Sequence, residues 1–359
     1  MQQTNHHKFP YRWTLKDARF TKDKGKVFSC FACGGGSTMG YKLAGFDVIG
    51  CNEIDPRMNK VYVANHHPRF NFLAPIQEFK LRKDLPAELY NLDILDGSPP
   101  CSSFSTAGSR EDGWGVEKKF REGQASQVLD TLFFDFIDLA KELQPKIVIA
   151  ENVKGLLLGA AMKYMARIYE EFDKAGYTLC HNLLDASTMG VPQKRERVFF
   201  TAIRKDLLQY VPQIHTLFED LPTIDLTFKE DGILLSEFSD FNGREMQGEC
   251  RKLWEKHRDG EHSLADACER ERGKSSYFCE VIVYQNEVCA TLTGQGKIHH
   301  HEKPLFLSDK EVRCVSSFPQ DYDFGNEKPE YICGMSVPPV MMAQVASRVY
   351  DQWLSKIPK

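Results

Sequence analysis

The sequence alternates between short apolar runs and longer amphipathic segments, and this alternation limits the possible folds more than any other feature. The runs DVIGC, LDIL and IVIA each have the length of a strand that is buried on both faces. The segments VLDTLFFDFIDLAKEL and AMKYMARIYEEFDKAGY carry apolar residues at helical spacing. Strands that alternate with helices predict an α/β fold, in which helices cover both faces of an open, mostly parallel sheet.

The character of the chain changes near residue 205, where the alternation gives way to short apolar runs and a highly charged stretch. Charges of mixed sign are typical of solvated helical faces. We therefore expect four parts: an N-terminal extension over 1–25, the α/β domain over 26–205, a smaller domain over 206–305, and a C-terminal segment over 306–359. The apolar pattern VPPVMMAQVASRVYDQWL predicts a last helix that returns to the α/β domain.

Composition narrows the class of protein only in part. The net charge of -4 lacks the basic excess of proteins that coat nucleic acid, so phosphate contacts would have to come from local clusters. The 11 cysteines show no disulfide framework, and we interpret the CxxC pair of Cys30 and Cys33 as free thiols without metal. The sequence has no apolar run long enough to span a membrane, which predicts a cytoplasmic protein.

The ends of the first two predicted strands suggest a cofactor, because ligands bind at the carboxyl ends of strands in such sheets. FACGGGSTMG follows one apolar run and opens a helix, as a nucleotide-binding turn does. Glu53 ends the next run, where a carboxylate can accept hydrogen bonds from both hydroxyls of a ribose. Together they predict a cofactor that contains adenosine. For the glycines alone, a tight turn without a ligand is the alternative.

The third strand end carries a candidate nucleophile in GSPPCSSFS. Two prolines stiffen the backbone before Cys101, and a nucleophilic cysteine needs a fixed geometry and a stabilised thiolate. The alternative is a buried cysteine that acts only as a small apolar side chain. The prolines and the position at a strand end favour the nucleophile.

Further polar groups accompany two later strands. Glu151, in ENVKG, follows the IVIA run and is a candidate proton donor; the alternative is an acid that caps the next helix. Arg195 and Arg197, in QKRER, alternate along a predicted strand and so share one face. One could grip a base or phosphate and the other a loop carboxylate, while a basic surface run is the alternative.

Taken in order, these motifs resemble those of the cytosine-5 DNA methyltransferase family, of the bacterial or phage type. That family's order is FxGxGG, an acid after the second strand, PPC or PC, ENV, QxRxR, a variable target-recognition region and a GNSVPP-like segment. This chain has FACGGG, NEID, SPPC, ENVKG, QKRER and GMSVPP in the same order. The resemblance covers about residues 26–205 and 305–355. It implies a Rossmann-like methyltransferase domain over 26–205 and target recognition by 206–305.

The resemblance also implies a reaction. Cys101 would attack carbon 6 of a cytosine flipped out of the duplex, because carbon 6 cannot be reached within the base stack. Glu151 would protonate or hydrogen-bond ring nitrogen 3, and carbon 5 would then take the methyl group of S-adenosylmethionine. Arg197 is similar in place to the arginine that contacts the cytosine, and Arg195 would support the loop. The segment over about 102–127 looks like a lid that closes on DNA.

Cofactor contacts follow from the same resemblance, and no metal is required. The implied contacts to S-adenosylmethionine are Phe31, Gly35, Gly36, Glu53, Ile54, Ile76, Pro99, Leu132, Ser336 and Val337. Cys33 replaces the first glycine of FxGxGG, and Met335 replaces the asparagine of GNSVPP. A GD pair whose aspartate binds the adenine amine is also replaced, and Gln77 or Glu78 could substitute for it.

Target recognition is expected within residues 206–305. The candidates for phosphate contacts are Lys297, His299, His300, His301 and Lys303. The histidine run lacks the accompanying acid or cysteine pattern of a metal site, so we do not expect it to bind metal.

Two alternatives remain open. A tRNA cytosine-5 methyltransferase would use the same scaffold, although the length of the recognition region favours DNA. A non-catalytic DNA-binding relative would be expected to lose Cys101 or Glu151, and both are present. We expect a monomer that binds double-stranded DNA and no membrane. A cognate restriction endonuclease could accompany it without a stable complex.

Overall fold

The computed structural model describes residues 7–100, 117–118, 127–128, 131–159, 161–215, 220–273 and 280–358. The chain divides into two compact units. The sheet unit comprises residues 19–184, 196–227 and 342–359, and the second unit comprises 1–18, 185–195 and 228–341. These units are defined by packing, and the functional parts expected from the sequence remain predictions.

The sheet unit alternates strands and helices as the sequence predicts. Its described strands are β1 (Lys26–Cys30), β2 (Asp47–Glu53), β3 (Phe70–Leu73), β4 (Ile94–Gly97), β5 (Glu117–Lys118), β6 (Gln127–Val128), β7 (Ile147–Val153), β8 (Tyr177–Asp185), β9 (Glu196–Arg204), β10 (Gln213–His215) and β11 (Asp220–Pro222). Its helices are α1 (Gly36–Leu43), α2 (Pro56–His66), α3 (Ile76–Phe79), α4 (Leu132–Leu143), α5 (Ala161–Lys174) and α10 (Pro339–Gln352), with short 3-10 turns at Ala87–Asn91, Lys154–Leu157, Lys205–Tyr210 and Leu354–Lys356.

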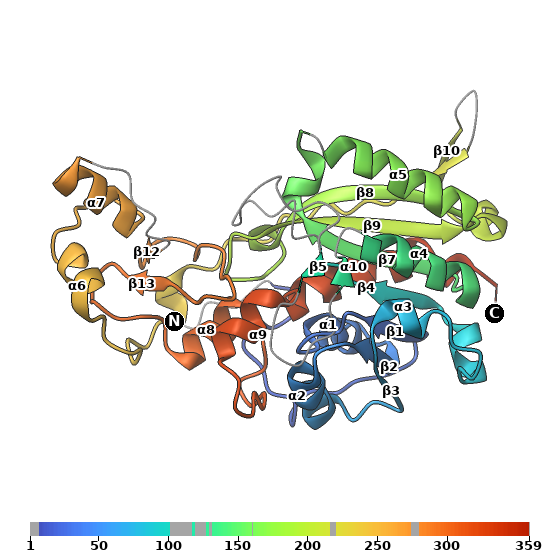
Figure 1. Cartoon of the computed structure of the whole chain (residues 1–359), viewed down its shortest axis with the longest axis horizontal. Coiled ribbons are helices and arrows are strands. Elements are labelled where there is room, and N and C mark those ends of the chain that lie inside the picture. The colour runs from blue at the N-terminus through green and yellow to red at the C-terminus, as the bar shows by residue number, and fades with distance from the viewer. Residues whose placement is uncertain are drawn as a thin grey trace. The chain divides into compact units, whose positions relative to one another are not determined.

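Seven of these strands form one sheet in the order β3-β2-β1-β4-β7-β9-β8 (Figure 1). All pairings from β3 through β7 are parallel, and β9 runs antiparallel to β7. The predicted mostly parallel sheet is therefore confirmed. The strand order reverses between β1 and β4, and in open α/β sheets a ligand crevice forms at the carboxyl ends of the strands at such a point.

Two neighbouring residues of β4 show that helices cover both faces of the sheet. Asp96 accepts a hydrogen bond from Ser37 of α1, whereas a Cβ at Gly97 would lie 2.6 Å from the ring of Phe136 in α4. Successive strand residues point to opposite faces, so α1 and α4 lie on opposite sides. Gly97 is needed because α4 packs directly on the backbone of β4.

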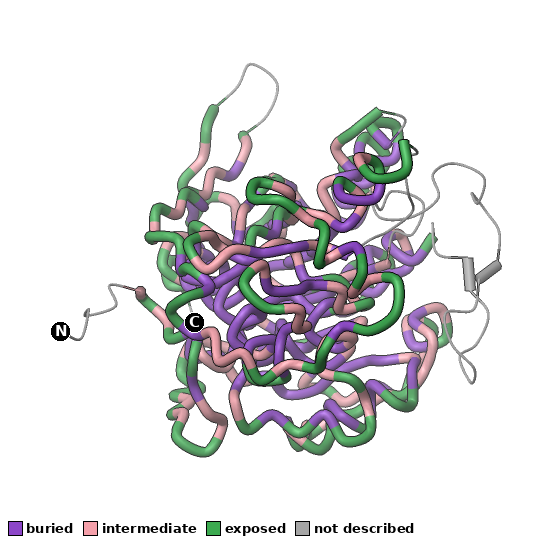
Figure 2. The backbone as a smooth tube through the Cα atoms, turned by 90° about the vertical axis from the view of Figure 1, so that its left-hand side faces the viewer, coloured by how far each residue is buried: buried purple, intermediate pink, exposed green. Residues whose placement is uncertain are grey.

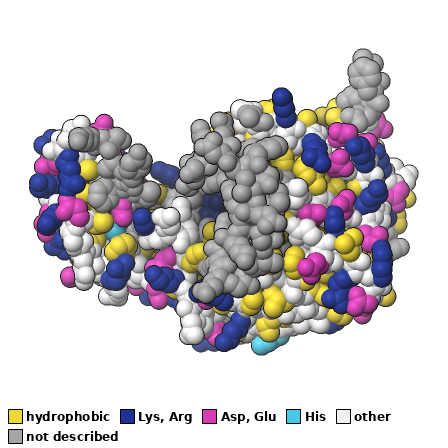
Figure 3. All heavy atoms as spheres, in the orientation of Figure 1, with side chains coloured by type: hydrophobic (Ala, Val, Ile, Leu, Met, Phe, Trp, Pro, Cys, Tyr) yellow, Lys and Arg dark blue, Asp and Glu magenta, His cyan; other side chains and the backbone are white. Residues whose placement is uncertain are grey.

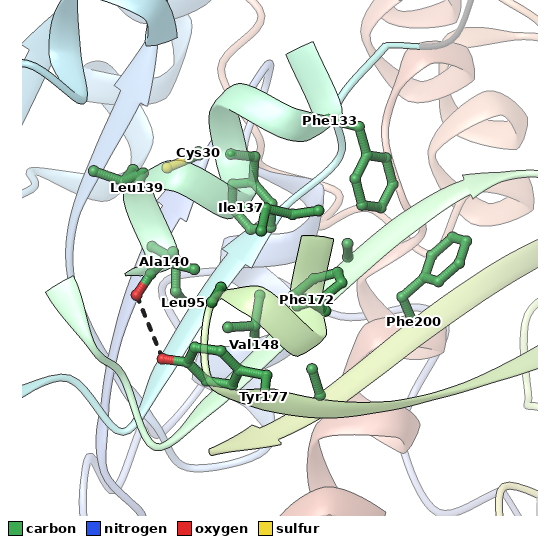
Figure 4. Packing of buried hydrophobic residues seen from close by; sticks show 14 of the residues in the cluster. Cys30, Leu95, Phe133, Ile137, Leu139, Ala140, Val148, Phe172, Tyr177 and Phe200 are labelled. Carbon is green, nitrogen blue, oxygen red and sulfur yellow. Dashed lines mark hydrogen bonds between the residues drawn. The ribbon is translucent and has the colours of Figure 1, made fainter. Parts of the chain in front are cut away.

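The core of the sheet unit is rich in aromatic side chains. Phe133 of α4 packs edge-on against Phe200 of β9, with ring centroids 5.3 Å apart. Tyr177 of β8 also belongs to this core, and its hydroxyl donates to the carbonyl oxygen of Ala140 in α4 at 3.4 Å (Figure 4). Figure 2 shows buried residues gathered in the interior, and nearly every residue of β4 and β7 is buried. Full burial of each such ring contributes roughly 1.5–3 kcal/mol, which holds α4 and α5 on the sheet.

The second unit has shorter elements. They are α6 (Gly248–Trp254), α7 (Leu264–Arg272), β12 (Val281–Val283), β13 (Ile298–His300), α8 (Asp309–Val315) and α9 (Pro329–Met335), with 3-10 turns at Ala186–Thr188 and Leu235–Glu237. Part of the expected N-terminal extension packs here. Trp13 is buried and donates to the carbonyl of Ser317 at 2.9 Å, and the ring of Tyr11 lies against Phe238. In the described part of the chain, no helix combines the length and apolar character needed to cross a membrane.

Candidate active site

The glycine-rich turn between β1 and α1 has an unusual backbone. Phe31, Cys33 and Gly35 all have positive φ, at 53°, 46° and 78°. This left-handed region is open to glycine and costs other residues about 1–2 kcal/mol. Cys33, which stands where the resembling family has glycine, therefore adopts a backbone conformation that glycine would take more readily.

A buried histidine braces this turn and lies beside a half-buried lysine. A Cβ added to Gly35 would lie 2.2 Å from Nε2 of His66, the last residue of α2. On its other side, the His66 Nδ1 lies 3.3 Å from the Lys42 Nζ of α1. Burial, together with Lys42, lowers the pKa of His66 well below its usual range, and burial lowers the pKa of Lys42 to about 8. His66 is therefore neutral at neutral pH.

Glu53 lies at the carboxyl end of β2 and is held by the turn. Its Oε2 accepts from the backbone N–H of Cys33 at 2.7 Å, and its Oε1 accepts from those of Ile54 and Asp55 at 2.9 Å. Burial raises the pKa of Glu53, although these three bonds oppose the rise. Oε2 keeps a second acceptor site, since a carboxylate oxygen has two lone pairs. The carboxylate is therefore fixed beside the glycine-rich turn and can still accept a ligand hydroxyl.

The segment after β3 lies beside the same strand end. The backbone N–H of Ala74 donates to the carbonyl of Glu53, and the Asn52 amide donates to the carbonyl of Ala74. Gln77 is half-buried, and its Oε1 is buried without a hydrogen-bond partner among the described residues. Glu78 is exposed. Of the two residues suggested for the adenine amine, Gln77 is therefore the one with a buried acceptor to offer.

The remaining cofactor candidates of the sheet unit surround these strand ends. Phe31 lies against Phe136, with ring centroids 6.3 Å apart, and Leu132 and Ile76 are buried in the same core cluster. Gly36 begins α1, and Pro99 is buried just beyond β4. The predicted set thus lies along the carboxyl ends of β1, β2, β3 and β4 and the start of α4.

The ends of β4 and β7 are joined by Asn152. Its amide Nδ2 donates to the carbonyl of Pro99 at 3.0 Å, while its Oδ1 accepts from the N–H of Val153 at 2.9 Å. The bond to the Pro99 carbonyl fixes the backbone two residues before Cys101. Cys101 itself and most of the expected lid over 102–127 lie outside the described residues.

Glu151 precedes Asn152 and forms an ion pair with Arg197. The Arg197 Nε lies 2.9 Å from the Glu151 Oε1, and both side chains are largely buried. The register of β7 and β9 explains the contact. Arg197 faces Val153 directly, so it is the diagonal neighbour of Glu151 on the same face. The carboxylate is thereby oriented by a cation that is itself held in a strand.

Arg195 lies just before β9 and has different partners, all within the second unit. It is buried and donates to the backbone carbonyls of Leu292, Gly334 and Ser336 at 3.0–3.1 Å. Arg195 therefore bonds backbone carbonyls of two segments of this unit, and its expected support of a loop stays a prediction. The predicted cofactor residues Ser336 and Val337 are both buried in this unit, and the Ser336 Oγ has no hydrogen-bond partner among the described residues.

The expectation that His299 and His300 contact phosphate is wrong, because both side chains are fully buried in the second unit. Burial lowers the pKa of His299 to about 4, so it carries no charge at neutral pH. His300 lies 3.2 Å from the carboxylate of Glu311 in α8. His301 lies 2.8 Å from His257. Lys303 is exposed and remains a candidate for phosphate contact.

Charge elsewhere is mixed. Lysine and arginine side chains are interspersed with aspartate and glutamate over the face drawn in Figure 3. Among the described residues, no group of three or more His, Cys, Asp or Glu is placed to hold a metal ion.

Comparison with known proteins agrees with this arrangement. The family model for "C-5 cytosine-specific DNA methylase" matches residues 25–351. The chain belongs to this family. Within it, the chain is 37% identical over 182 residues to the type II methyltransferase M.FnuDI of Fusobacterium nucleatum, a match that covers 51% of this chain and 48% of the relative. The chain thus spans about half the length of this relative.

Other proteins match over more of their length. The type II methyltransferase M1.HphI of Haemophilus parahaemolyticus is 27% identical over 334 residues, which is 89% of this chain and 85% of the relative. The crystal structure of an E. coli prophage-encoded DNA modification methyltransferase matches with a TM-score of 0.61 at 19% identity, covering 91% of this chain and 99% of that one. Spodoptera frugiperda DNMT2 matches with a TM-score of 0.58 at 18% identity, covering 89% of this chain and 98% of that one. The predicted fold class is confirmed.

Sequence reasoning did not predict the contacts of three residues, two in the sheet unit and one in the second unit. Asn152 was visible within ENV, yet its bond to Pro99 depends on the pairing of distant strands. Gln193, in QKRER, accepts from the N–H of Leu292 and donates to the carbonyl of Val315. Asp96 is buried in β4, and a carboxylate next to a glycine suggested only the end of a strand.

Proposed function

We propose that this chain is a sequence-specific DNA cytosine-5 methyltransferase, which transfers the methyl group of S-adenosylmethionine to carbon 5 of a flipped cytosine through a covalent adduct with Cys101. The observation that carries the proposal is the junction of β4 and β7. There Asn152 holds the carbonyl of Pro99, and the adjacent Glu151 is paired with Arg197. The segment that leads to Cys101 and the oriented carboxylate of Glu151 therefore both lie at the carboxyl ends of neighbouring parallel strands.

The residues at the neighbouring strand ends fit S-adenosylmethionine. The glycine-rich turn lies beside the fixed Glu53 carboxylate, whose Oε2 can accept from a ribose hydroxyl. The buried acceptor of Gln77 suits an adenine amine, which donates hydrogen bonds. When bound, this cofactor supplies a methyl group that its sulfonium has already activated.

Each catalytic residue then has a defined task. The Cys101 thiolate adds to carbon 6, and Glu151, after taking up a proton from solvent on Oε2, gives this proton or its hydrogen bond to ring nitrogen 3, so that negative charge does not accumulate on the ring. Arg197 occupies Oε1 of Glu151, which leaves Oε2 for the base. After carbon 5 has taken the methyl group, loss of the carbon-5 proton and of Cys101 restores the double bond.

The decisive test is Cys101→Ser. We expect turnover on duplex DNA to be lost, by a factor of at least about 10³, while S-adenosylmethionine still binds, because only the nucleophile is removed. Tritiated methyl transfer and calorimetric titration of the cofactor measure the two properties. Turnover close to the wild-type rate would exclude the covalent mechanism.

A trapping experiment on wild-type protein supports the same step. Duplex DNA with 5-fluorocytosine at the target should give a complex that survives denaturing electrophoresis, because fluorine cannot leave as a proton. A parallel assay with tRNA separates the alternative substrate. Methylation of tRNA without methylation of DNA would move the proposal to the RNA branch of the scaffold.

Target choice is assigned to residues 206–305, and double-stranded DNA is the proposed partner. The curated relatives include type II methyltransferases and phage orphan methyltransferases. Both types fit a chain that modifies DNA with or without a cognate endonuclease. A monomeric state remains part of the proposal.

A further inference from the structure

Asp96 is a buried carboxylate that has no part in the mechanism above. It lies on β4 and is 2% exposed. Its Oδ2 accepts from the hydroxyls of Ser29 at 2.7 Å and Ser37 at 2.6 Å, and its Oδ1 accepts from the Tyr41 hydroxyl at 3.2 Å. Three donors from β1 and α1 therefore converge on one acidic group.

None of these partners carries a positive charge. A buried carboxylate is normally paired with a cation, because desolvation of an unpaired ion is costly. Here the partners are neutral hydroxyls, and the nearby charge of Glu151 is negative. Burial raises the pKa of Asp96 to about 6, since the hydroxyl donors offset only part of the desolvation. At neutral pH the group is ionised, and no cation among the described residues is paired with it.

Asp96 lies directly beneath the glycine-rich turn. Ser37, which it binds, follows Gly36 in the first turn of α1, and the residue after Asp96 begins the segment that leads to Pro99. The carboxylate is therefore linked through the Ser37 hydroxyl to the start of α1, next to the glycine-rich turn. In such a water-poor position, a fixed charge acts strongly on a charged ligand.

We propose that Asp96 is a specificity-determining residue of the cofactor site, whose buried negative charge favours the cationic methyl donor over its neutral product. This inference rests on the proposed function. S-adenosylmethionine and S-adenosylhomocysteine share their adenosine, amino and carboxylate groups and differ by the methyl group and by the positive charge of the sulfonium. A carboxylate without a counter-ion lowers the free energy of the charged ligand more than that of the neutral one, and so promotes exchange of product for donor.

The charge of Asp96 can be removed by acid as well as by mutation. The titratable groups that face it are Tyr41 from α1, Cys30 from β1 and Glu151 from β7. Burial raises the pKa of both Tyr41 and Cys30 well above their usual values, so neither ionises near neutral pH. Lowering the pH from about 7.5 to about 5 therefore removes the Asp96 charge while these two groups stay neutral.

The test measures binding of each ligand separately, by calorimetry, to the wild-type chain, Asp96→Asn and Thr38→Val. Asparagine keeps the size of the side chain and removes its charge. Thr38→Val is the matched control, because Thr38 is buried in the same turn of α1 and bonds Tyr62 rather than Asp96. Thermal melting of the unliganded variants checks that each is folded.

We expect Asp96→Asn to reduce the ratio of donor affinity to product affinity about tenfold, which corresponds to ~1.4 kcal/mol. In the wild-type chain the same ratio should fall as the pH drops through about 6, and in Asp96→Asn it should not. Thr38→Val should leave the ratio unchanged. Equal losses for both ligands in Asp96→Asn, or a pH-independent wild-type ratio, would overturn the inference.

Three further outcomes keep the inference separate from the proposed function. If Asp96→Asn does not fold, the pH dependence of the wild-type ratio decides alone. If the wild-type chain binds neither ligand, the proposed function fails. If it binds both without discrimination that depends on pH, only the role of Asp96 fails.

Discussion

The backbone at Gly35 has a φ of 78° and passes close to the imidazole of His66. Two separate constraints meet at this position. Any side chain would have to adopt a left-handed conformation, and its Cβ would lie 2.2 Å from the His66 Nε2. His66 has little freedom to move, because it is buried against Tyr62 and lies beside Lys42. The geometry of the glycine-rich turn therefore depends on this one residue.

Gly35→Ala should destabilise the sheet unit by roughly 2–4 kcal/mol, which combines the left-handed backbone with an overpacked contact. Gly176→Ala is the matched control, because Gly176 has a φ of 90° and open space around its Cβ position. It should cost only about 1 kcal/mol. Urea denaturation measures both variants. Equal losses would show that the His66 contact adds nothing.

Individual residues also show what the sequence could and could not predict. Glu53 and Glu151 were recognised because apolar runs end at them, and both lie at strand ends. His299 and His300 were misjudged, because a run of three histidines looks exposed until β13 is seen to be buried. The hydroxyl partners of Asp96 come from residues 55 to 67 positions away, so local pattern could not reveal them.

At the scale of elements, the two arginines of QKRER connect different parts of the chain. Arg197, in β9, pairs with Glu151 of β7. Arg195 joins the segment around Leu292 to the end of α9 through three backbone carbonyls. Periodicity predicted the strand and placed both residues near its start. It could not predict these partners, because the segments that Arg195 joins are far away in sequence.

Because the two arginines have different partners, replacing each with lysine should change stability by different amounts. Arg195→Lys should destabilise the second unit by about 3 kcal/mol, since an ammonium cannot reproduce a planar fork that serves three carbonyls. Arg197→Lys can keep its ion pair with Glu151 and should change stability by less than about 1 kcal/mol. Thermal denaturation compares the two variants. If Arg197→Lys proved the more destabilising, the roles assigned to the arginines would be reversed.

At the scale of the whole molecule, each unit contains a buried carboxylate with a displaced pKa, and the displacements have opposite signs. In the second unit, burial would raise the pKa of Glu311, but His300 and the N–H groups of Ser308 and Asp240 lower it to about 2. In the sheet unit, burial raises the pKa of Asp96 to about 6. The carboxyl groups of Asp and Glu in an unfolded chain titrate at about pH 4.

Acid should therefore affect the two units in opposite directions. The contribution of Glu311 is present above its unfolded pKa and is lost as the pH falls from about 4.5 toward 2. Asp96 favours the folded state when protonated, and that contribution is lost as the pH rises from about 4 through 6. Each effect is on the order of 1–3 kcal/mol.

Native-state hydrogen exchange at several pH values resolves the two units. Amides of α1 should gain protection between pH ~6 and ~4, and amides of α8 should lose it below pH ~4. Asp96→Asn should weaken the first trend, to which the raised pKa of buried Glu53 also contributes, and Glu311→Gln should remove the second. Parallel changes in both units would contradict the assignment.

The sheet unit includes residues 342–359, which are synthesised after the intervening second unit, and this order has a consequence during translation. Tyr350 of α10 covers Phe46, and Trp353 donates to the carbonyl of Thr223 at 2.9 Å. A ribosome adds roughly 5–20 residues per second, so residues 228–341 are synthesised before α10 can cover Phe46. The nascent chain thus has all seven strands of the sheet but lacks the last helix of the sheet unit until synthesis is nearly complete.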